Sequence, residues 1–390
     1  MSVHILLPGE DGSHVDYTLH APGNFPQTCQ PPSSRRVYAA AHIVSRADAH
    51  ADQPVAEQID WEATGAYRRH LWSLGFSVAE AMDTAQRGMG LDWEAARALI
   101  RRSASEAHAI GAQDRLACGA GTDQLAVSAT TTLDDICAAY EEQCAFIEGE
   151  GSRIILMASR ALAALARSPE DYARVYERVL SQVRQPVILH WLGAMFDPAL
   201  TGYWGSEQLD EAMTFCLDLI QRHAAKIDGV KLSLLSAERE IAMRRRLPAG
   251  VVMYTGDDFN YVGLIRGDAQ GYSHALLGIF DAIAPAAAAA LQALDQGDIT
   301  TYEVLLASTV SLSRHIFQAP TYYYKTGVVF LAYLNGHQPH FRMVGGLENA
   351  RSLAHLAQLF MLADQAGLLR EPELAVERMQ RVIATHGGEA

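Results

Sequence analysis

Residues 227–233 read IDGVKLS, a short apolar run with a lysine, Lys231, at its centre. A stretch in which Leu209, Met213 and Leu217 recur on one helical face comes before it. Short apolar runs that alternate with longer amphipathic stretches are typical of a parallel sheet covered by helices. Residues 227–233 are therefore predicted to hold a buried strand of a repeated strand-helix unit.

The same alternation extends in both directions, from Arg36 to about residue 295. Eight repeats of strand and helix joined by short connections favour a closed barrel over an open sheet. The sequence thus predicts the α/β class, a (β/α)8 TIM barrel with an irregular N-terminal extension and a C-terminal helical bundle. The eight expected strands are Val37–Val44, Phe76–Met82, Arg115–Cys118, Arg153–Met157, Val187–His190, Val230–Leu232, Val251–Tyr254 and Tyr272–Leu277.

Three regions follow from this pattern. Residues 1–36 are rich in Pro, Gly and His, and we expect an irregular extension with room for one short hairpin, serving as a lid or an oligomer arm. Residues 37–298 form the expected catalytic barrel, and residues 299–390 form a helical region. Its expected helices are Thr300–Ile316, Thr321–Leu334, Leu347–Ala366 and Pro372–Thr385.

The composition excludes several classes of function. With 49% hydrophobic and 19% charged residues, the 390-residue chain is an ordinary globular protein. Its net charge of −14 argues against nucleic-acid binding, which requires a phosphate-neutralising surface. The N-terminus lacks the features of a signal peptide, no segment is apolar for the length of a membrane span, and the five cysteines form no CxxC pair. We therefore expect a cytoplasmic protein with reduced thiols that binds no membrane.

Lys231 is the first candidate for chemistry, because reactive groups in such barrels lie at the C-terminal ends of strands. The chain has only three lysines, and Lys231 is the one on an expected strand. Burial disfavours the ammonium form of lysine and makes the neutral amine available as a nucleophile. Alternatively, Lys231 faces a water-filled barrel mouth and forms an ion pair with Asp257 or Asp258.

Other polar residues follow the expected strands at the same end of the barrel. His190 ends the fifth strand and is a candidate general acid/base, or else a structural hydrogen-bond donor. One of Asp257 and Asp258 can instead cap the next helix, while the other faces the site. His274 and Asp281 are weaker candidates. The residues expected to bind substrate are Asp83, Thr84, Gln86, Thr122, Asp123, Asp257 and Asp258.

Six short motifs occur in an order that carries a resemblance. They are Ile59-Asp60-Trp61, Leu91-Asp92-Trp93-Glu94, CGAGT (118–122), PVILH (186–190), GVKLS (229–233) and GDD (256–258). From about Ile59 to Pro285 the chain resembles the dihydrodipicolinate synthase and N-acetylneuraminate lyase superfamily of class I, Schiff-base barrel enzymes. The resemblance implies that Lys231 forms an imine with a small carbonyl substrate and that the protein is a homo-oligomer, a dimer or tetramer. Because the iminium itself accepts electrons, no cofactor is expected.

The chain departs from the family's pattern at three places. His190 stands where the family has a proton-relaying tyrosine, and an imidazole that titrates near neutrality can replace it. The loop that binds a substrate carboxylate in the family reads AMDTAQRGMG here, which retains Thr84 and adds Asp83. Asp83 would repel a carboxylate, so we expect a hydroxylated, sugar-derived ketone or aldehyde and not pyruvate. The tyrosine after the fourth strand is replaced by Ala158-Ser159-Arg160, where Arg160 either binds an anion or is a surface residue.

Two alternatives remain open at this point. One is a non-catalytic sensor barrel, in which Lys231 is an ion-pair partner. The other is a metal-dependent sugar isomerase or epimerase, for which the ligands or bases would be His42, Glu80, Asp83, His190 and Asp257. A separate loop cluster after the first strand consists of His42, Asp48, His50 and Asp52. Its residue types suit a divalent metal, or else the cluster is simply solvated.

Overall fold

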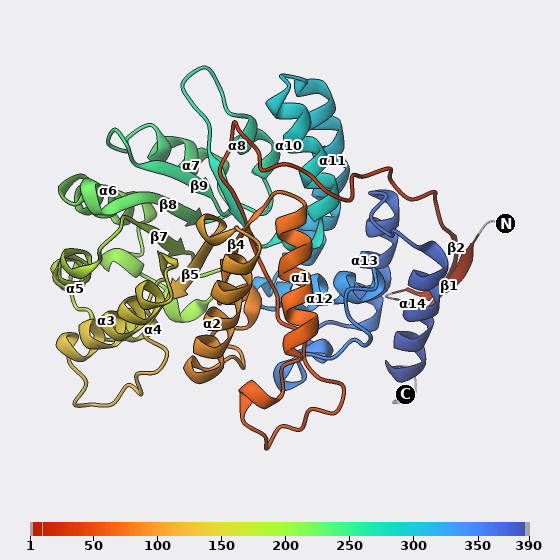
Figure 1. The fold of residues 1–390 in the computed structure, drawn as a ribbon, viewed down its shortest axis with the longest axis horizontal. Helices are drawn as coiled ribbons and strands as arrows, with labels where there is room; N and C mark the ends of the chain where they lie inside the picture. The colour runs from red at the N-terminus through yellow and green to blue at the C-terminus, as the bar shows by residue number, and fades with distance from the viewer. Residues whose placement is uncertain (1–2, 10, 387–390) are drawn as a thin grey trace.

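The computed structural model describes residues 3–9 and 11–386, and its central feature is a closed barrel (Figure 1). Its eight strands run parallel in the order β10-β3-β4-β5-β6-β7-β8-β9, so the predicted (β/α)8 barrel is confirmed. The strands are β3 (Val37–Ala40), β4 (Ser77–Glu80), β5 (Leu116–Ala120), β6 (Arg153–Leu156), β7 (Val187–Leu192), β8 (Ile227–Ser233), β9 (Val252–Thr255) and β10 (His274–Leu277).

Helices follow the strands and cover the outside of the barrel (Figure 1). Asp60 and Asp92 cap the first two by accepting hydrogen bonds from the amides of Ala63 and Ala95. The helices up to residue 295 are α1 (Trp61–Ser73), α2 (Trp93–Ala109), α3 (Leu133–Gly149), α4 (Arg160–Leu165), α5 (Pro169–Gln182), α6 (Leu209–Arg222), α7 (Ala237–Arg244), α8 (Tyr261–Arg266), α9 (Ile279–Ala282) and α10 (Ala284–Asp295).

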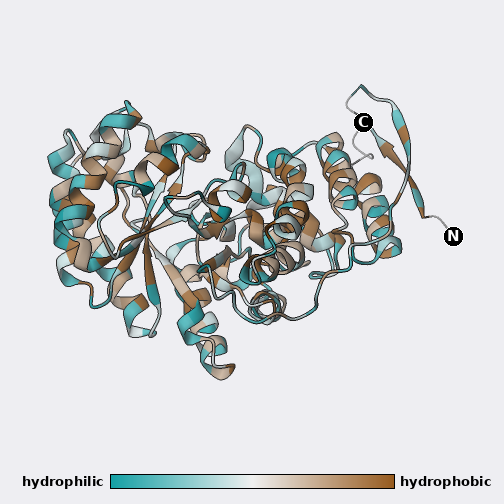
Figure 2. Cartoon of the chain, turned by 90° about the horizontal axis from the view of Figure 1, so that it is seen from above, coloured by the Kyte–Doolittle hydropathy of each residue, from teal (hydrophilic) through white to brown (hydrophobic). Residues whose placement is uncertain are grey.

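The barrel strands are apolar on both sides, which is why the sequence showed them as continuous runs. Figure 2 shows brown, hydrophobic strands inside the barrel and hydrophilic residues on the outer helices. Ile155, Ile188 and Tyr254 belong to a small cluster of buried side chains from several strands. Because these side chains alternate with others that pack against the helices, the cluster marks the inner face of the barrel.

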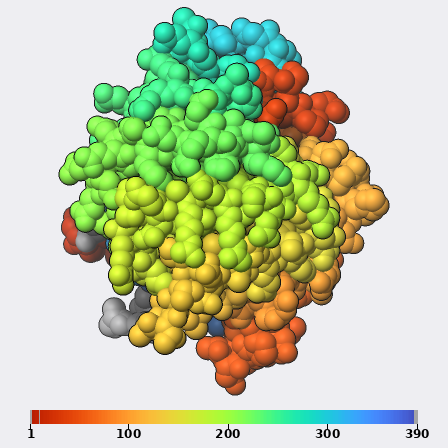
Figure 3. Space-filling view, turned by 90° about the vertical axis from the view of Figure 1, so that its left-hand side faces the viewer, coloured from red at the N-terminus to blue at the C-terminus, as the bar shows by residue number. Residues whose placement is uncertain are grey.

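The chain continues after the barrel into the C-terminal helices α11 (Ile299–Ile316), α12 (Tyr324–Leu334), α13 (Leu353–Gln365) and α14 (Pro372–His386). The helix predicted from Leu347 begins only at Leu353. Residues 344–350 form a kinked 3-10 segment, because Gly345 and Gly346 have φ angles of 71° and 72°. Figure 3 shows the side of the molecule that lies on the left in Figure 1, away from the C-terminal helices, where α3, α5 and α6 form the surface in yellow and green.

The N-terminal extension contains one hairpin, formed by β1 (His4–Pro8) and β2 (His14–Thr18). It lies beside the C-terminal helices and away from the barrel (Figures 1 and 2). The hydroxyl of Tyr17 donates a hydrogen bond of 2.7 Å to Asp364 on α13. No helix in the described part of the chain combines the length and apolar character needed to cross a membrane.

Candidate active site

Lys231 lies on the inner face of β8. Its neighbours Val230 and Leu232 pack in the core between strands and helices, whereas Gly229 pairs in register with Ile188 of the inner cluster. Because side chains alternate along a strand, Lys231 points into the barrel with Gly229. Only 7% of Lys231 is exposed.

The space around the Lys231 side chain depends on Gly256, which follows β9. A Cβ atom at Gly256 would collide with the hydroxyl of Ser233 and would come within 3.0 Å of Cε of Lys231. The glycine of the GDD motif therefore makes room for the lysine. This packing is a physical reason why a glycine precedes the two aspartates.

Burial lowers the pKa of Lys231 below its ordinary value, while the carboxylates of Asp83 and Asp258 partly oppose this change. Among the described residues no carboxylate forms an ion pair with the amine. The direct ion pair with Asp257 or Asp258, considered from the sequence, is thus absent. A buried amine with a lowered pKa and no direct partner retains the character of a nucleophile.

His190 is the register partner of Lys231 on β7 and also points into the barrel. Its Nε2 lies 3.3 Å from the hydroxyl of Ser233. Burial, together with the positive charge of Lys231, lowers the pKa of His190 well below its ordinary value. This shift favours the neutral imidazole, which is the form that acts as a base. The catalytic role expected for His190 stays a prediction.

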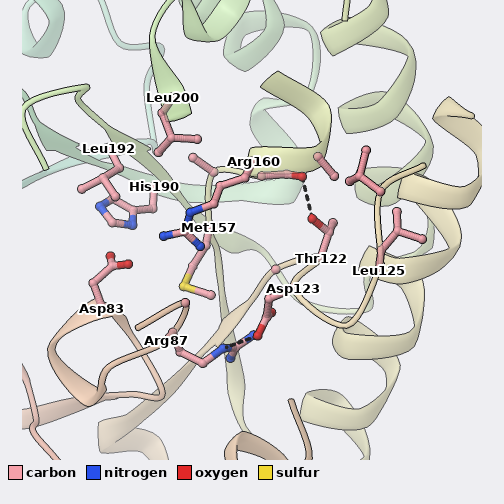
Figure 4. Close-up of a pocket in the computed structure, with 16 residues that line it drawn as sticks. Asp83, Arg87, Thr122, Asp123, Leu125, Met157, Arg160, His190, Leu192 and Leu200 are labelled. Carbon is pink, nitrogen blue, oxygen red and sulfur yellow. Dashed lines mark hydrogen bonds and ion pairs between the residues drawn. The ribbon is translucent and has the colours of Figure 1, made fainter. Parts of the chain in front are cut away.

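A cavity of about 270 Å³ opens at the C-terminal ends of β4 to β7. Asp83, Arg160 and His190 line it and point toward one another (Figure 4). Thr122 lines the same cavity and shares a hydrogen bond of 2.6 Å with Ser159. Lys231 lies one strand beyond His190, within the electrostatic reach of Asp83. The polar groups of three loops and of β7 thus converge at this cavity, whose lining does not include Lys231 itself.

Two arginines at this cavity are held by carboxylates. Arg87 forms an ion pair with Asp123 and donates to the carbonyl of Gly119 at 3.1 Å, so it braces the loop after β4 against the end of β5. Arg160 pairs with Asp197 from the loop after β7. Its side chain is 39% exposed and lines the cavity, so it is neither wholly buried nor a remote surface residue. The sequence analysis had not singled out Arg87 or Asp197.

The other predicted substrate-binding residues do not line the cavity. Gln86 is buried and donates to the carbonyl of Val344 at 2.8 Å, so it holds the C-terminal region. Asp257 accepts hydrogen bonds from the amides of Phe259 and Asn260 in the turn before α8, whose N-cap is Asn260, so the expected helix cap at Asp257 is not formed. Asp258 is buried, accepts from the amide of Ile279 at 2.8 Å, and has its pKa raised to about 7 by burial.

The C-terminal region contributes two residues at the barrel mouth that sequence reasoning missed. The hydroxyl of Tyr324 is 2.8 Å from that of Thr84, and the Tyr324 ring stacks on Phe317. Lys325 is 2% exposed, donates to the carbonyl of Tyr322 at 3.2 Å, and has its pKa lowered to about 8 by burial. The scarcity of lysine was the one signal in the sequence that pointed to Lys325.

The residues of the alternative metal site do not gather. His42 contacts Asp281 through Nδ1 at 2.9 Å, and Glu80 accepts two hydrogen bonds of 2.8 Å from Arg68. Asp48 pairs with Arg46 at the surface. Within residues 3–9 and 11–386 no group of three or more His, Cys, Asp or Glu side chains is placed to hold a metal ion. His274 lies at the start of β10, where it accepts from the amide of Arg36.

Comparisons with known proteins agree with this architecture. A family model described as "Protein of unknown function (DUF993)" matches residues 5–388. No curated protein sequence matches the chain. One similar solved structure is that of YagE in complex with pyruvate, a prophage protein of the dihydrodipicolinic acid synthase family from E. coli K12. It has 16% identity to this chain and a TM-score of 0.66, and the match covers 86% of this chain and 99% of YagE.

Two further structures are similar at comparable levels. Dihydrodipicolinate synthase from Aquifex aeolicus has 13% identity and a TM-score of 0.64, over 86% of this chain and 99% of its own. The 4-hydroxy-tetrahydrodipicolinate synthase from Methylacidiphilum fumariolicum SolV has 14% identity and a TM-score of 0.63, over 91% and 98%. At these identities the likeness establishes a shared fold, which confirms at that level the resemblance expected from the motifs.

Proposed function

The chain belongs to the family described as "Protein of unknown function (DUF993)", a description that names no activity. We therefore propose from its site that it is a class I Schiff-base lyase. Its substrate is a small carbonyl compound, and Lys231 is the imine-forming nucleophile. The observation that carries the proposal is the buried amine of Lys231 on the inner face of the barrel, beside His190 in register and without an ion-pair partner in the described chain.

Chemistry begins with the neutral amine of Lys231. Its lone pair attacks the carbonyl carbon, and the carbonyl oxygen takes up one proton from solvent, which gives a carbinolamine protonated on nitrogen. Loss of the hydroxyl group together with one proton of that nitrogen releases water and leaves the iminium ion, which keeps the positive charge. Because burial already lowers the pKa of the amine, deprotonation before attack requires less free energy than it would for an exposed lysine.

The iminium then accepts the electron pair of a breaking bond next to the former carbonyl carbon, as in aldol cleavage or β-elimination. We assign to His190 the proton transfers of this stage. Its imidazole is neutral, so it begins as a base that removes a proton from a substrate hydroxyl or carbon. The hydroxyl of Ser233, 3.3 Å from Nε2, is a route for the same proton.

The residues around the cavity support a hydroxylated substrate. Asp83 accepts hydrogen bonds from hydroxyl groups and repels a carboxylate placed next to it. Thr122 and Ser159 add two hydroxyls on the facing wall. Arg160 is partly neutralised by Asp197, so its charge does not dominate the cavity. We therefore propose a sugar-derived ketone or aldehyde, acted on by a cytoplasmic homo-oligomer, in preference to pyruvate.

Substrate-dependent inactivation by borohydride tests this proposal, because reduction converts the imine into a stable secondary amine. The protein is incubated with borohydride and either pyruvate or one of a panel of keto- and aldo-sugars, and the mass of the intact chain is measured. We expect hydroxylated sugars to add their mass and to protect against addition of pyruvate. Efficient addition of pyruvate alone would show that Asp83 does not select the substrate. No addition by any carbonyl compound that the protein turns over would contradict the Schiff base.

A further inference from the structure

A second, smaller cavity of about 50 Å³ lies between the N-terminal extension, α1, α9 and the C-terminal helices. It shares no lining residue with the cavity at the barrel mouth. Its walls include Tyr67 and His70 from α1, together with His337 and Arg370 from the C-terminal region. A space that holds one water molecule needs roughly 10–15 Å³, so this cavity has room for a ligand of only a few non-hydrogen atoms.

A column of aromatic rings forms the inner wall. The distance between ring centroids is 4.3 Å from His42 to Tyr67 and 5.0 Å from Tyr67 to His337. It is 4.6 Å from His337 to His70. His70 lines the cavity, and its buried Nε2 has no hydrogen-bond partner among the described residues. Buried polar atoms of this kind are normally satisfied, so this nitrogen points to a missing ligand or water.

The charges around the cavity select the sign of that ligand. Burial lowers the pKa of His70 to about 4 and that of His337 to about 2, so both rings are neutral and each has one N–H to donate. The Asp281 carboxylate is already engaged by the amide and ring of His42, at 2.7 and 2.9 Å. Arg370 contributes a positive charge at the edge of the cavity, where its side chain is 45% exposed, lies 3.5 Å from the carboxylate of Glu371 and donates to the carbonyl of Asn335 at 3.2 Å. Glu371 does not line the cavity, so the arginine is the charged group that an anion in the cavity would meet.

Much of the remaining wall is apolar, with Phe25, Leu331 and Leu368, and Gln27 and Asn335 add amide groups. We propose that this cavity binds a small aliphatic monocarboxylate, between acetate and butyrate in size. Its carboxylate pairs with Arg370 and accepts hydrogen bonds from the imidazoles, and its alkyl chain contacts the apolar wall. A cation would meet Arg370 and no free carboxylate among the lining residues.

The cavity is connected to the barrel mouth by the short helix α9. The hydroxyl of Tyr67 donates a hydrogen bond of 2.7 Å to the carbonyl of Asp281 near the end of α9. At the start of α9, the amide of Ile279 donates to Asp258, which lies near Lys231. A ligand that orders Tyr67 and His70 therefore also stabilises α9, so the proposal includes a measurable effect on this helix.

Thermal unfolding in the presence of propionate tests the site. We expect a saturable rise in Tm for the wild type, since a ligand that binds only the folded state stabilises it. Arg370→Met should raise the half-saturating concentration by roughly 10- to 100-fold, the effect of losing a charge-assisted hydrogen bond. His337→Phe keeps the aromatic contact but removes a donor, so it should weaken binding in the same direction. Arg381→Met is the matched control, because Arg381 lies on α14, pairs with Glu377 and does not line the cavity.

Two further measurements complete the test. Propionate should slow amide hydrogen exchange in the peptide that contains residues 279–282, and Lys231→Met should bind propionate as well as the wild type does. The second result separates this site from the proposed Schiff-base chemistry, which Lys231→Met abolishes. The proposal is overturned if propionate gives no saturable shift in Tm, or if only inorganic phosphate gives one. It is also overturned if Arg370→Met and His337→Phe bind propionate as the wild type does, or if Lys231→Met abolishes binding. Unchanged exchange in residues 279–282 would contradict it as well.

Discussion

His190 is a neutral base in a buried position, and this defines what its removal should do. The pKa of its imidazole is lowered well below the ordinary value by burial and by Lys231, so His190 can accept a proton throughout the neutral pH range. Replacing it by Phe keeps a ring of similar size on β7. We expect His190→Phe to lower kcat by about 10²–10⁴-fold, the usual contribution of general acid/base catalysis.

The control for this variant is the formation of the imine itself. Trapping by borohydride reports the attack of Lys231, which does not require His190, so the trapping rate should change far less than kcat. An unchanged kcat would instead assign to His190 only the structural contact with Ser233.

Asp258 influences the proton on Lys231. Its carboxylate raises the pKa of the lysine and thereby opposes the effect of burial. In Asp258→Asn the amide oxygen can still accept the hydrogen bond from Ile279, but the negative charge is lost. The pKa of Lys231 should therefore fall further, and the pH at which imine formation is half-maximal should move to lower values.

The pH dependence of borohydride trapping measures this shift. Asp268→Asn is a matched control, because Asp268 pairs with Arg244 and Arg245 at the surface and does not affect the pKa of Lys231. A shift to higher pH in Asp258→Asn, or an equal shift in both variants, would contradict this electrostatic account.

At the scale of elements, a buried ion pair connects α1, β4 and α2. Arg68 on α1 donates two hydrogen bonds of 2.8 Å to Glu80 at the end of β4, and the hydroxyl of Ser103 on α2 donates a third at 2.6 Å. The side chains of Arg68 and Glu80 are 1% and 0% exposed. Glu80 comes directly before the loop that bears Asp83, so this pair also positions the wall of the cavity.

Breaking this pair should be costly. Arg68→Met leaves Glu80 buried without its cation, which should lower the free energy of unfolding by about 3–5 kcal/mol. Removing both charges in Arg68→Met with Glu80→Gln should recover part of this loss. Urea denaturation measures both variants. A loss below about 1 kcal/mol in the single variant would place the pair among weak, solvent-screened interactions.

The elements of the barrel could be predicted because both faces of each strand are buried, which produces apolar runs that are visible in the sequence. Residues of the site that lie at strand ends, such as Lys231 and His190, could be placed for the same reason. The hydrogen bond between Thr84 and Tyr324 could not be predicted, since its partners are 240 residues apart and nothing local links them. Gln86 was expected to bind substrate because its amide suits neutral hydroxyl groups. It has a φ angle of 66°, and its amide donates to the carbonyl of Val344 instead.

At the scale of the whole molecule, the N-terminal hairpin is the part that stands farthest from the barrel (Figure 2). It leaves Leu6 56% and Val15 42% exposed, so both apolar side chains are available for contact with another chain. We expect this arm to contact a second copy of the chain. Light scattering should give a mass of two or four times 42.5 kDa, and Leu6→Glu should lower it. A mass of 42.5 kDa at every concentration would show that the protein is a monomer.

The central claim is that Lys231 forms an imine, and peptide mapping after borohydride trapping tests it most directly. Only Lys226, Lys231 and Lys325 can carry a lysine label, and Lys325 is an internal control because it is also buried with a lowered pKa. We predict that the substrate's mass is found on the peptide containing Lys231, and that Lys231→Arg, whose guanidinium stays protonated, abolishes labelling and turnover. Labelling at Lys325, or turnover without any labelled lysine, would contradict the account.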